Sequence, residues 1–165
     1  MKTYRLVRFS SELDGLALED APRPALAHGQ VRVRVRAVAL NYRDLLVARG
    51  VYTRNPRIGL VPCSDGAGDV VEVGDGVAAV RVGMRVAGTF FQTWLDGAPT
   101  RAHMRSDLGG GLDGMLAEEV VLDEHGVVEV PAHLSWAEAA TLPCAAVTAW
   151  HALVSAGGLR AGDTV

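Results

Sequence analysis

The chain has 165 residues, of which 49% are hydrophobic, so it can bury a core and is too apolar to be intrinsically disordered. Its 16 basic and 19 acidic residues give a net charge of −3, which argues against a general nucleic-acid binder, because such proteins usually carry a basic surplus. Residues 1–8 show no signal peptide, and no apolar run reaches the roughly 18–20 residues of a membrane-spanning helix. We therefore expect a cytoplasmic protein with no nucleic-acid partner and no membrane partner.

The two cysteines, Cys63 and Cys144, lie far apart in the sequence. Because no export signal is visible, the expected environment is a reducing cytosol, in which thiols stay free. Both cysteines are interpreted as small buried side chains rather than as a disulfide.

Residues 1–132 are predicted to be rich in β-structure. Residues 31–36 alternate Val with Arg, which indicates a strand with one buried face and one face of solvated arginines rather than a phosphate-binding stripe. Further short strands are expected at 70–73, 85–88, 117–122 and 127–130. Short strands separated by Gly and Asp are typical of a small β-barrel, closed or nearly closed.

Two segments interrupt this β-pattern. Residues 42–49 have helical character and end at Gly50, a suitable C-terminal glycine. Residues 90–114 are predicted to form a long mobile loop, and loops of that length are often functional. The glycines at 109–114 lack a preceding strand and a following helix, so they do not predict a dinucleotide-binding turn.

The C-terminal part of the sequence is predicted to be helical. Ser135 and Glu138 have the spacing of a capping box, which marks a helix start. Pro143 should end that helix, because proline lacks an N–H and clashes with the preceding turn. A second helix should run to about residue 155 and stop at Gly157.

Four segments, in this order and spacing, resemble the medium-chain dehydrogenase/reductase superfamily. They are residues 39–46, 61–71, 82–86 and 139–150. The resemblance implies a mainly β fold with helices: a GroES-like β-barrel catalytic domain at 1–132, then the first helices of a Rossmann domain at 133–165. In relatives, the glycine-rich turn for the cofactor follows a Gly-Asp-Thr-Val strand, and this sequence stops there, so we expect the chain alone to be inactive.

The residues in two short segments distinguish the branches of that superfamily. Zinc-dependent members carry Cys-His where this chain has Asn41 and Tyr42, and Gly-His-Glu where it has Cys63, Ser64 and Asp65. A catalytic zinc takes three Cys, His or carboxylate ligands, and two of them are replaced here. We therefore expect no metal, and the chain resembles the zinc-independent quinone oxidoreductases and the enoyl reductase domains of polyketide and fatty acid synthases.

The enoyl reductase motif Leu-Asn-(Phe/Tyr)-Arg-Asp occurs here at residues 40–44. Without a metal, the implied chemistry is hydride transfer from NAD(P)H, in which the protein supplies position and polar groups. The resemblance implies that the nicotinamide is contacted by Asn41, Tyr42, Arg43 and Thr148.

The resemblance also assigns catalytic roles and a substrate pocket. Asn41 is expected to donate an amide hydrogen, and Tyr52 corresponds to a tyrosine that can give a proton to the substrate. The substrate pocket is predicted from Asp65, Phe90 and Trp94, with Asp65 supporting the loop.

Each of these residues also has a structural interpretation. Asn41 can cap the following helix, and Thr148 can pack within an Ala-rich helix. Tyr52 can be a rim aromatic, while Phe90 and Trp94 can simply anchor the long loop.

The main hypothesis is the catalytic-domain portion of a zinc-independent NAD(P)H oxidoreductase that acts on a small molecule. One alternative is a non-enzymatic GroES-like module, whose exposed helical flank at 135–155 would bind a partner or a second copy of the chain. Another is a zinc-type alcohol dehydrogenase with atypical ligands. Quinone, enoyl thioester and simple alcohol or aldehyde substrates all stay open, as does the choice between NADH and NADPH.

Overall fold

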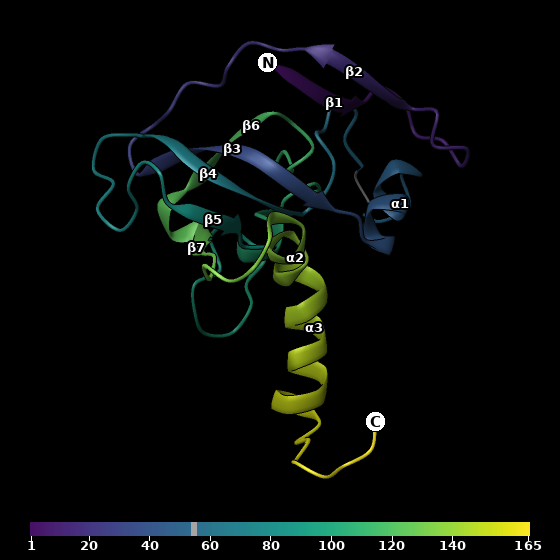
Figure 1. The fold of residues 1–165 in the computed structure, drawn as a ribbon. Helices are drawn as coiled ribbons and strands as arrows, with labels where there is room; N and C mark the ends of the chain where they lie inside the picture. The colour runs from purple at the N-terminus through teal and green to yellow at the C-terminus, as the bar shows by residue number, and fades with distance from the viewer. Residues whose placement is uncertain (54–55) are drawn as a thin grey trace.

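The computed structural model describes residues 1–53 and 56–165, which form two antiparallel sheets and a C-terminal helical segment (Figure 1). The larger sheet has the strand order β6-β3-β4-β5-β7. Its strands are β3 (Gln30–Ala39), β4 (Asp65–Val73), β5 (Arg85–Gly88), β6 (Glu119–Asp123) and β7 (Val127–Glu129). The smaller sheet pairs β1 (Lys2–Leu6) with β2 (Leu16–Asp20).

The larger sheet curls strongly around its core. Strands β6 and β7 lie at its opposite edges, yet only the short turn η2 (Glu124–Gly126) connects them. In the described part of the chain these two edge strands do not pair with each other. The predicted mainly β fold with helices is therefore confirmed, while the barrel is open along one seam.

Strand β3 supplies the centre of the core. Val31 and Val33 are 0% and 1% exposed, and they pack with apolar side chains of β4, β5 and β6. On the opposite face, Arg34 and Arg36 are exposed, as predicted. Arg32 corrects the prediction of a wholly solvated arginine face, since it is only 4% exposed.

The helix α1 (Tyr42–Ala48) begins after Asn41 at its N-cap and is followed by Gly50, whose φ is 72°. The helix α2 (Trp136–Ala140) begins at the predicted capping box, in which the backbone N–H of Ser135 donates to Oε2 of Glu138 at 2.8 Å. Both predicted helix starts are therefore confirmed.

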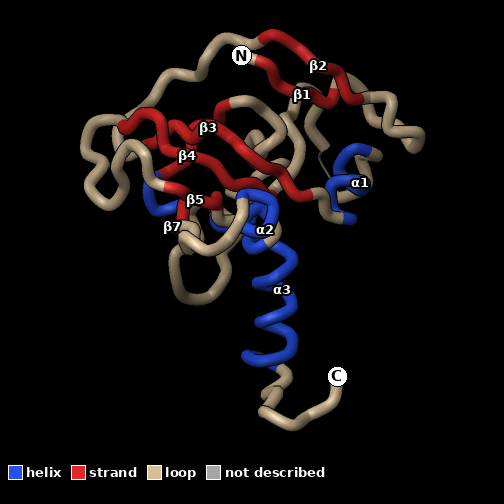
Figure 2. Tube along the Cα trace, in the orientation of Figure 1, coloured by secondary structure: helices blue, strands red, loops and turns tan. Residues whose placement is uncertain are grey.

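The helical chain resumes around Pro143, as predicted. It comprises η3 (Leu142–Ala146), α3 (Val147–Trp150) and η4 (His151–Ala156), of which η3 and η4 have wide π-type turns. Figure 2 shows this segment projecting away from the sheets, with Val147 and Trp150 59% and 66% exposed. Among the helices of the described residues, none is long and apolar enough to cross a membrane.

Residues 90–114, predicted as a long mobile loop, contain backbone pairing and a short helix of their own. Phe91 forms a β-bridge with Asp107, and the N–H of Leu108 donates to the carbonyl of Phe90 at 3.0 Å. A short 3-10 helix, η1 (His103–Arg105), lies at the far end of the segment. Residues 90–114, called the excursion below, thus form a folded loop in which the backbone near Phe91 pairs with the backbone near Asp107.

Candidate active site

Asp65 joins three separate elements at the end of the sheet. It is the first residue of β4 and is 0% exposed. Its Oδ2 accepts hydrogen bonds from Nδ2 of Asn41 at 3.0 Å and from the backbone N–H of Cys144 at 3.1 Å. One carboxylate oxygen therefore fixes the N-cap of α1 and the helix η3 relative to β4.

The turn that leads into β4 explains how Asp65 comes to be buried. Cys63 has a φ of 70°, which is unusual for a residue with a side chain, and it is 2% exposed. A Cβ on Gly109 would lie 2.8 Å from the backbone of Cys63, and one on Gly114 would overlap its carbonyl. The glycines that do not form a nucleotide-binding turn instead let the chain pack closely against this turn.

The site holds two buried carboxylates. Burial raises the pKa of Asp65 and of Asp44, and hydrogen bonds from Asn41 oppose the rise in both cases. Oδ2 of Asp44 accepts the backbone N–H of Asn41 at 2.8 Å. Within the described residues, Oδ1 of each carboxylate is buried without a hydrogen-bond partner. Both carboxyls therefore hold a proton more readily than an exposed aspartate does.

The two thiols of the site are held in the neutral form. Burial raises the pKa of Cys63 to about 12 and also raises that of Cys144, which is only half-buried. Neither thiol is therefore an activated nucleophile.

An apolar pocket of about 500 Å³ lies directly in front of this network. Its walls come from the start of the folded excursion, from β7 and from the helices η3 and α3. It is lined by Gly88, Thr89, Phe90, Phe91, Trp94, Val128, Leu142, Pro143, Cys144, Val147 and Thr148. Three predicted site residues, Phe90, Trp94 and Thr148, therefore line one pocket. Asn41 is connected to the pocket wall by two hydrogen bonds, because Asp65 accepts both from Asn41 and from the backbone of Cys144, which lines the pocket.

Arg43 is held by several contacts behind the pocket wall, and its predicted cofactor contact stays a prediction. It is 8% exposed, and its guanidinium lies over the rings of Tyr52 and Phe90, 4.6 and 4.7 Å from their centroids. Nη2 pairs with the carboxylate of Asp107, and Nη1 donates to the carbonyl of Leu108 at 2.9 Å. Arg43 therefore anchors the excursion to α1 and supports the pocket wall from behind.

The remaining predicted residues lie around this pocket rather than in it. Tyr52 lines a separate small pocket with Phe9 and Leu60. Tyr42 is 71% exposed on the first turn of α1. The carboxylate of Asp65 lies behind Cys144 and does not line the pocket, so it positions other groups. The catalytic role of Tyr52 and the cofactor contact of Tyr42 stay predictions.

Sequence reasoning missed two residues of the site. Asp107, the partner of Arg43, lies 64 residues further along the chain, and no local pattern links the two. Cys144 was interpreted as a buried side chain, whereas it lines the pocket and donates its backbone N–H to Asp65. Its place directly after Pro143 is the signal that could have identified it.

The groups around Asp65 can be compared with the ligands of a catalytic zinc. Asp65 is hydrogen-bonded to the side-chain amide of Asn41 and to the backbone N–H of Cys144, and it follows Ser64, whereas a catalytic zinc takes three Cys, His or carboxylate ligands. In residues 1–53 and 56–165, no group of three or more His, Cys, Asp or Glu side chains is placed to hold a metal ion.

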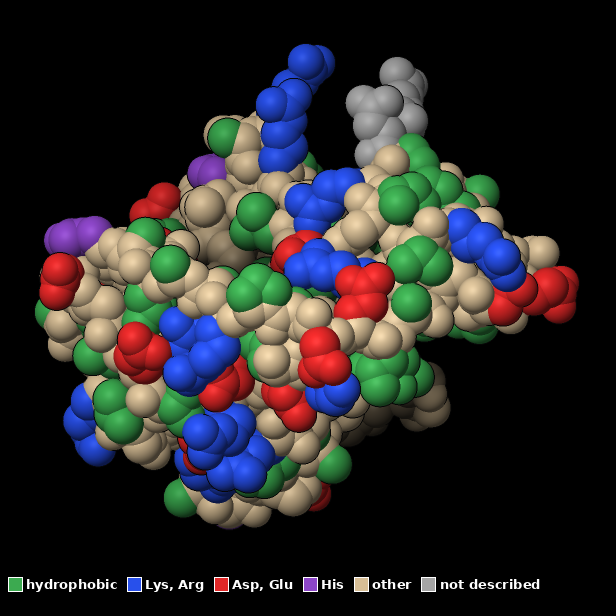
Figure 3. Space-filling view, turned by 90° about the horizontal axis from the view of Figure 1, so that it is seen from above, with side chains coloured by type: hydrophobic (Ala, Val, Ile, Leu, Met, Phe, Trp, Pro, Cys, Tyr) green, Lys and Arg blue, Asp and Glu red, His purple; other side chains and the backbone are tan. Residues whose placement is uncertain are grey.

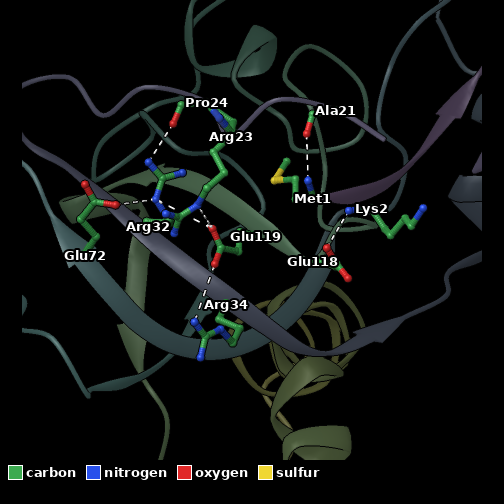
Figure 4. Close-up of polar contacts among 10 residues, drawn as sticks. All are labelled: Met1, Lys2, Ala21, Arg23, Pro24, Arg32, Arg34, Glu72, Glu118 and Glu119. Atoms are coloured by element: carbon green, nitrogen blue, oxygen red, sulfur yellow. Dashed lines mark hydrogen bonds and ion pairs between the residues drawn. The ribbon is translucent and has the colours of Figure 1, made fainter. Parts of the chain in front are cut away.

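The charged residues on the outer face of β3 and β6 form a second polar cluster. Figure 4 shows Arg23, Arg32 and Arg34 converging on Glu119, with N–O distances of 2.7, 4.0 and 3.8 Å. Nε of Arg32 also pairs with Glu72 at 2.7 Å, and that arginine lowers the pKa of Glu72. On the face seen in Figure 3, basic and acidic side chains are interspersed, as such pairing requires.

Residues 27–132 match the sequence model of the alcohol dehydrogenase GroES-like domain. A zinc-type alcohol dehydrogenase-like protein of Schizosaccharomyces pombe is 44% identical over 144 residues, which cover 87% of this chain and 42% of that protein. The chain therefore belongs to the alcohol dehydrogenase GroES-like domain family, within the medium-chain dehydrogenase/reductase superfamily.

Two solved structures support the same assignment. An alcohol dehydrogenase structure from Sinorhizobium meliloti superimposes with a TM-score of 0.88 at 41% identity, covering 98% of this chain and 48% of that one. A quinone oxidoreductase from Pseudomonas syringae gives 0.74 at 26% identity, with 94% and 41% covered. The relatives are oxidoreductases, and the chain spans less than half the length of each of these three.

Proposed function

We propose that this chain is the catalytic-domain portion of a zinc-independent NAD(P)H-dependent oxidoreductase that reduces a small carbonyl or enone substrate. The observation that carries the proposal is the hydrogen bonding of Asp65 to Asn41 and to Cys144, at the wall of an apolar pocket. A bound reduced nicotinamide supplies the hydride.

The polar groups around the pocket fit the nicotinamide end of such a cofactor. Asp65 takes an N–H of the Asn41 amide and thereby fixes the orientation of that side chain. Thr148 places a hydroxyl in the pocket, and Tyr42 is exposed on the first turn of α1. Asn41, Thr148 and Tyr42 are thus the proposed nicotinamide contacts, whereas Arg43 supports them from behind.

The apolar walls of the pocket also favour the proposed hydride transfer. Aromatic and aliphatic side chains exclude water, and a nicotinamide ring held against them is placed for direct transfer to a substrate in the same pocket. The described residues contain no strand, glycine-rich turn and helix in succession that could hold a pyrophosphate. We therefore propose that the 165-residue chain alone has no measurable NAD(P)H turnover.

Binding of reduced nicotinamide mononucleotide tests the proposal, because this probe needs no second phosphate site. In an NMR titration of the chain, we expect the amide resonances of Asn41, Thr148 and Cys144 to shift selectively. The matched control is N41A, which should lose the shift at Thr148 while keeping the same fold. Shifts confined to the separate groove between Arg81 and Ala132, or no shift at all, would overturn it.

A second candidate is a zinc-type alcohol dehydrogenase with atypical ligands, which the name of the Schizosaccharomyces pombe relative favours. Cys63 and Asp65 would be two of its ligands, and among the described residues no group of three or more His, Cys, Asp or Glu side chains is placed to hold a metal ion. The zinc content of the purified protein separates the two candidates.

We also propose that the exposed flank supports self-association. Val147, Trp150, Leu153 and Val154 are each more than a third exposed on the projecting helix. Covering them would remove apolar surface from water. Light scattering should then show a mass that rises with concentration, and W150S should lower it; a concentration-independent monomer would contradict this.

A further inference from the structure

The wall of the apolar pocket suggests which substrates it selects. Phe90, Phe91 and Trp94 form a continuous aromatic surface, with ring centroids 4.6 and 5.6 Å apart along the series. Such rings prefer to contact another flat π-system by edge or offset stacking. An aliphatic ligand of the same size would gain only the general benefit of burial.

Contacts within the chain hold this aromatic surface in place. The backbone of Phe91 is bridged to Asp107, which in turn pairs with the buried Arg43. The rings of Trp94 and His103 are stacked, with their centroids 6.2 Å apart and an interplanar angle of 10°. The Nε1–H of Trp94 also donates to the carbonyl of Gly97 at 3.1 Å. A ligand that stacks here therefore does not have to order these side chains on binding.

The charge of the pocket limits the ligand further. None of its lining residues carries a charge. The guanidinium nearest to its wall, that of Arg43, lies against Phe90 and is already bound to Asp107 and Leu108. An anionic group placed in this pocket would lose its hydration without gaining a partner. The polar side chain of Thr148 in the lining is the proposed nicotinamide contact, so the substrate itself meets mainly apolar and aromatic groups.

We propose that Phe91 and Trp94 are specificity-determining residues that select an uncharged substrate whose carbonyl is conjugated to a flat ring. This inference rests on the proposed function and names the substrate class of that site. Saturated ketones and substrates with an anionic group next to the carbonyl are the classes that it excludes.

Three probes of one skeleton test the proposal on the chain: acetophenone, its saturated counterpart cyclohexyl methyl ketone, and the anionic 4-acetylbenzoate. Binding is followed by NMR at the three tryptophan indole resonances, with that of Trp94 assigned from W94F. We expect acetophenone to shift the Trp94 resonance and to bind about threefold to tenfold more tightly than the saturated ketone. The anionic probe should produce no shift over the same concentrations.

Variants identify the residues responsible. W94L should weaken acetophenone binding about fivefold and leave cyclohexyl methyl ketone unchanged. The matched control W150L changes an exposed tryptophan outside the pocket and should bind as the parent does. F91L repeats the test with a second residue in case W94L disturbs the excursion.

Equal affinity for the flat and saturated ketones, or full binding by W94L and F91L, would overturn the inference. The titration with reduced nicotinamide mononucleotide separates this failure from a failure of the proposed function. If the mononucleotide shifts the amide resonance of Asn41 and acetophenone does not shift the indole resonance of Trp94, only the substrate class is wrong. If acetophenone binds and nicotinamide does not, the ring site stands and the oxidoreductase proposal falls.

Discussion

The carboxylates on the outer face of the sheet and those at its inner end are compensated in different ways. Glu119 lies within 4.0 Å of three arginines, and Arg32 lowers the pKa of Glu72. Asp65 instead accepts hydrogen bonds from the neutral amide of Asn41 and the backbone N–H of Cys144, and burial raises its pKa. Ion pairs thus stabilise the outer face, whereas the inner end retains a carboxyl with an unpartnered oxygen beside a pocket.

This difference separates carboxylates that stabilise the fold from a buried carboxyl that lies beside the candidate site. On the outer face, Arg23 and Arg34 are half-exposed, so each of these two arginines can change at a small cost. At the inner end a buried carboxyl without an ionic partner is unfavourable for folding. Such a group is typical of functional sites, where perturbed pKa values gather.

The largest expected effect comes from breaking the buried pair that supports the pocket wall. D107A removes the hydrogen-bonded carboxylate partner of the buried Arg43, which keeps Asp44 at 3.7 Å and the Leu108 carbonyl, and should lower the free energy of unfolding by about 3 kcal/mol. Denaturant unfolding measures this loss. D107N, which can still accept a hydrogen bond, should recover part of it; a loss below about 1 kcal/mol in D107A would show that Arg43 does not depend on this pair.

A smaller effect is expected on the outer face. E119Q removes the charge shared by Arg23, Arg32 and Arg34, but two of these arginines are half-exposed and Arg32 keeps Glu72. The expected loss is about 1 kcal/mol or less, and it should shrink as salt is added. A loss as large as that of D107A would erase the distinction between the two regions.

The smallest effect concerns pH. Because the pKa of folded Asp65 lies above its ordinary value of 3.8, its contribution to stability is greatest below that value and is lost as pH rises through the raised pKa. The free energy of unfolding of the parent relative to D65N should therefore fall as pH increases above about 4. The opposite slope would mean that this carboxyl is stabilised in its charged form.

Much of the fold could be predicted from local sequence. The alternation in residues 31–36 predicted β3, and the Ser135 and Glu138 spacing predicted the start of α2, because both signals are periodic or local. The hairpin of β1 and β2 was missed, since a buried position of β1 is the polar Thr3 and most of the hydrophobic residues of β2 are exposed or half-exposed. The curl of the sheet depends on long-range pairing that no local pattern reveals.

The site could be predicted only in part, for a similar reason. The motif at 40–44 located Asn41, and the aromatics Phe90 and Trp94 were assigned to a pocket that the structure does contain. The placement of Arg43 depends on Asp107, a partner brought close by the fold alone. The role of Asp65 as the link between α1 and η3 likewise needs three distant segments in place.

Zinc binding tests the central claim most directly. The chain is exposed to equimolar zinc, passed over a desalting column and analysed for the metal. The positive control is the double variant N41C/S64H, which together with Cys144 restores three ligands of the kind zinc prefers. We expect about one zinc per chain in this variant and less than about one-tenth in the parent. One tightly bound zinc per parent chain would contradict a metal-independent site.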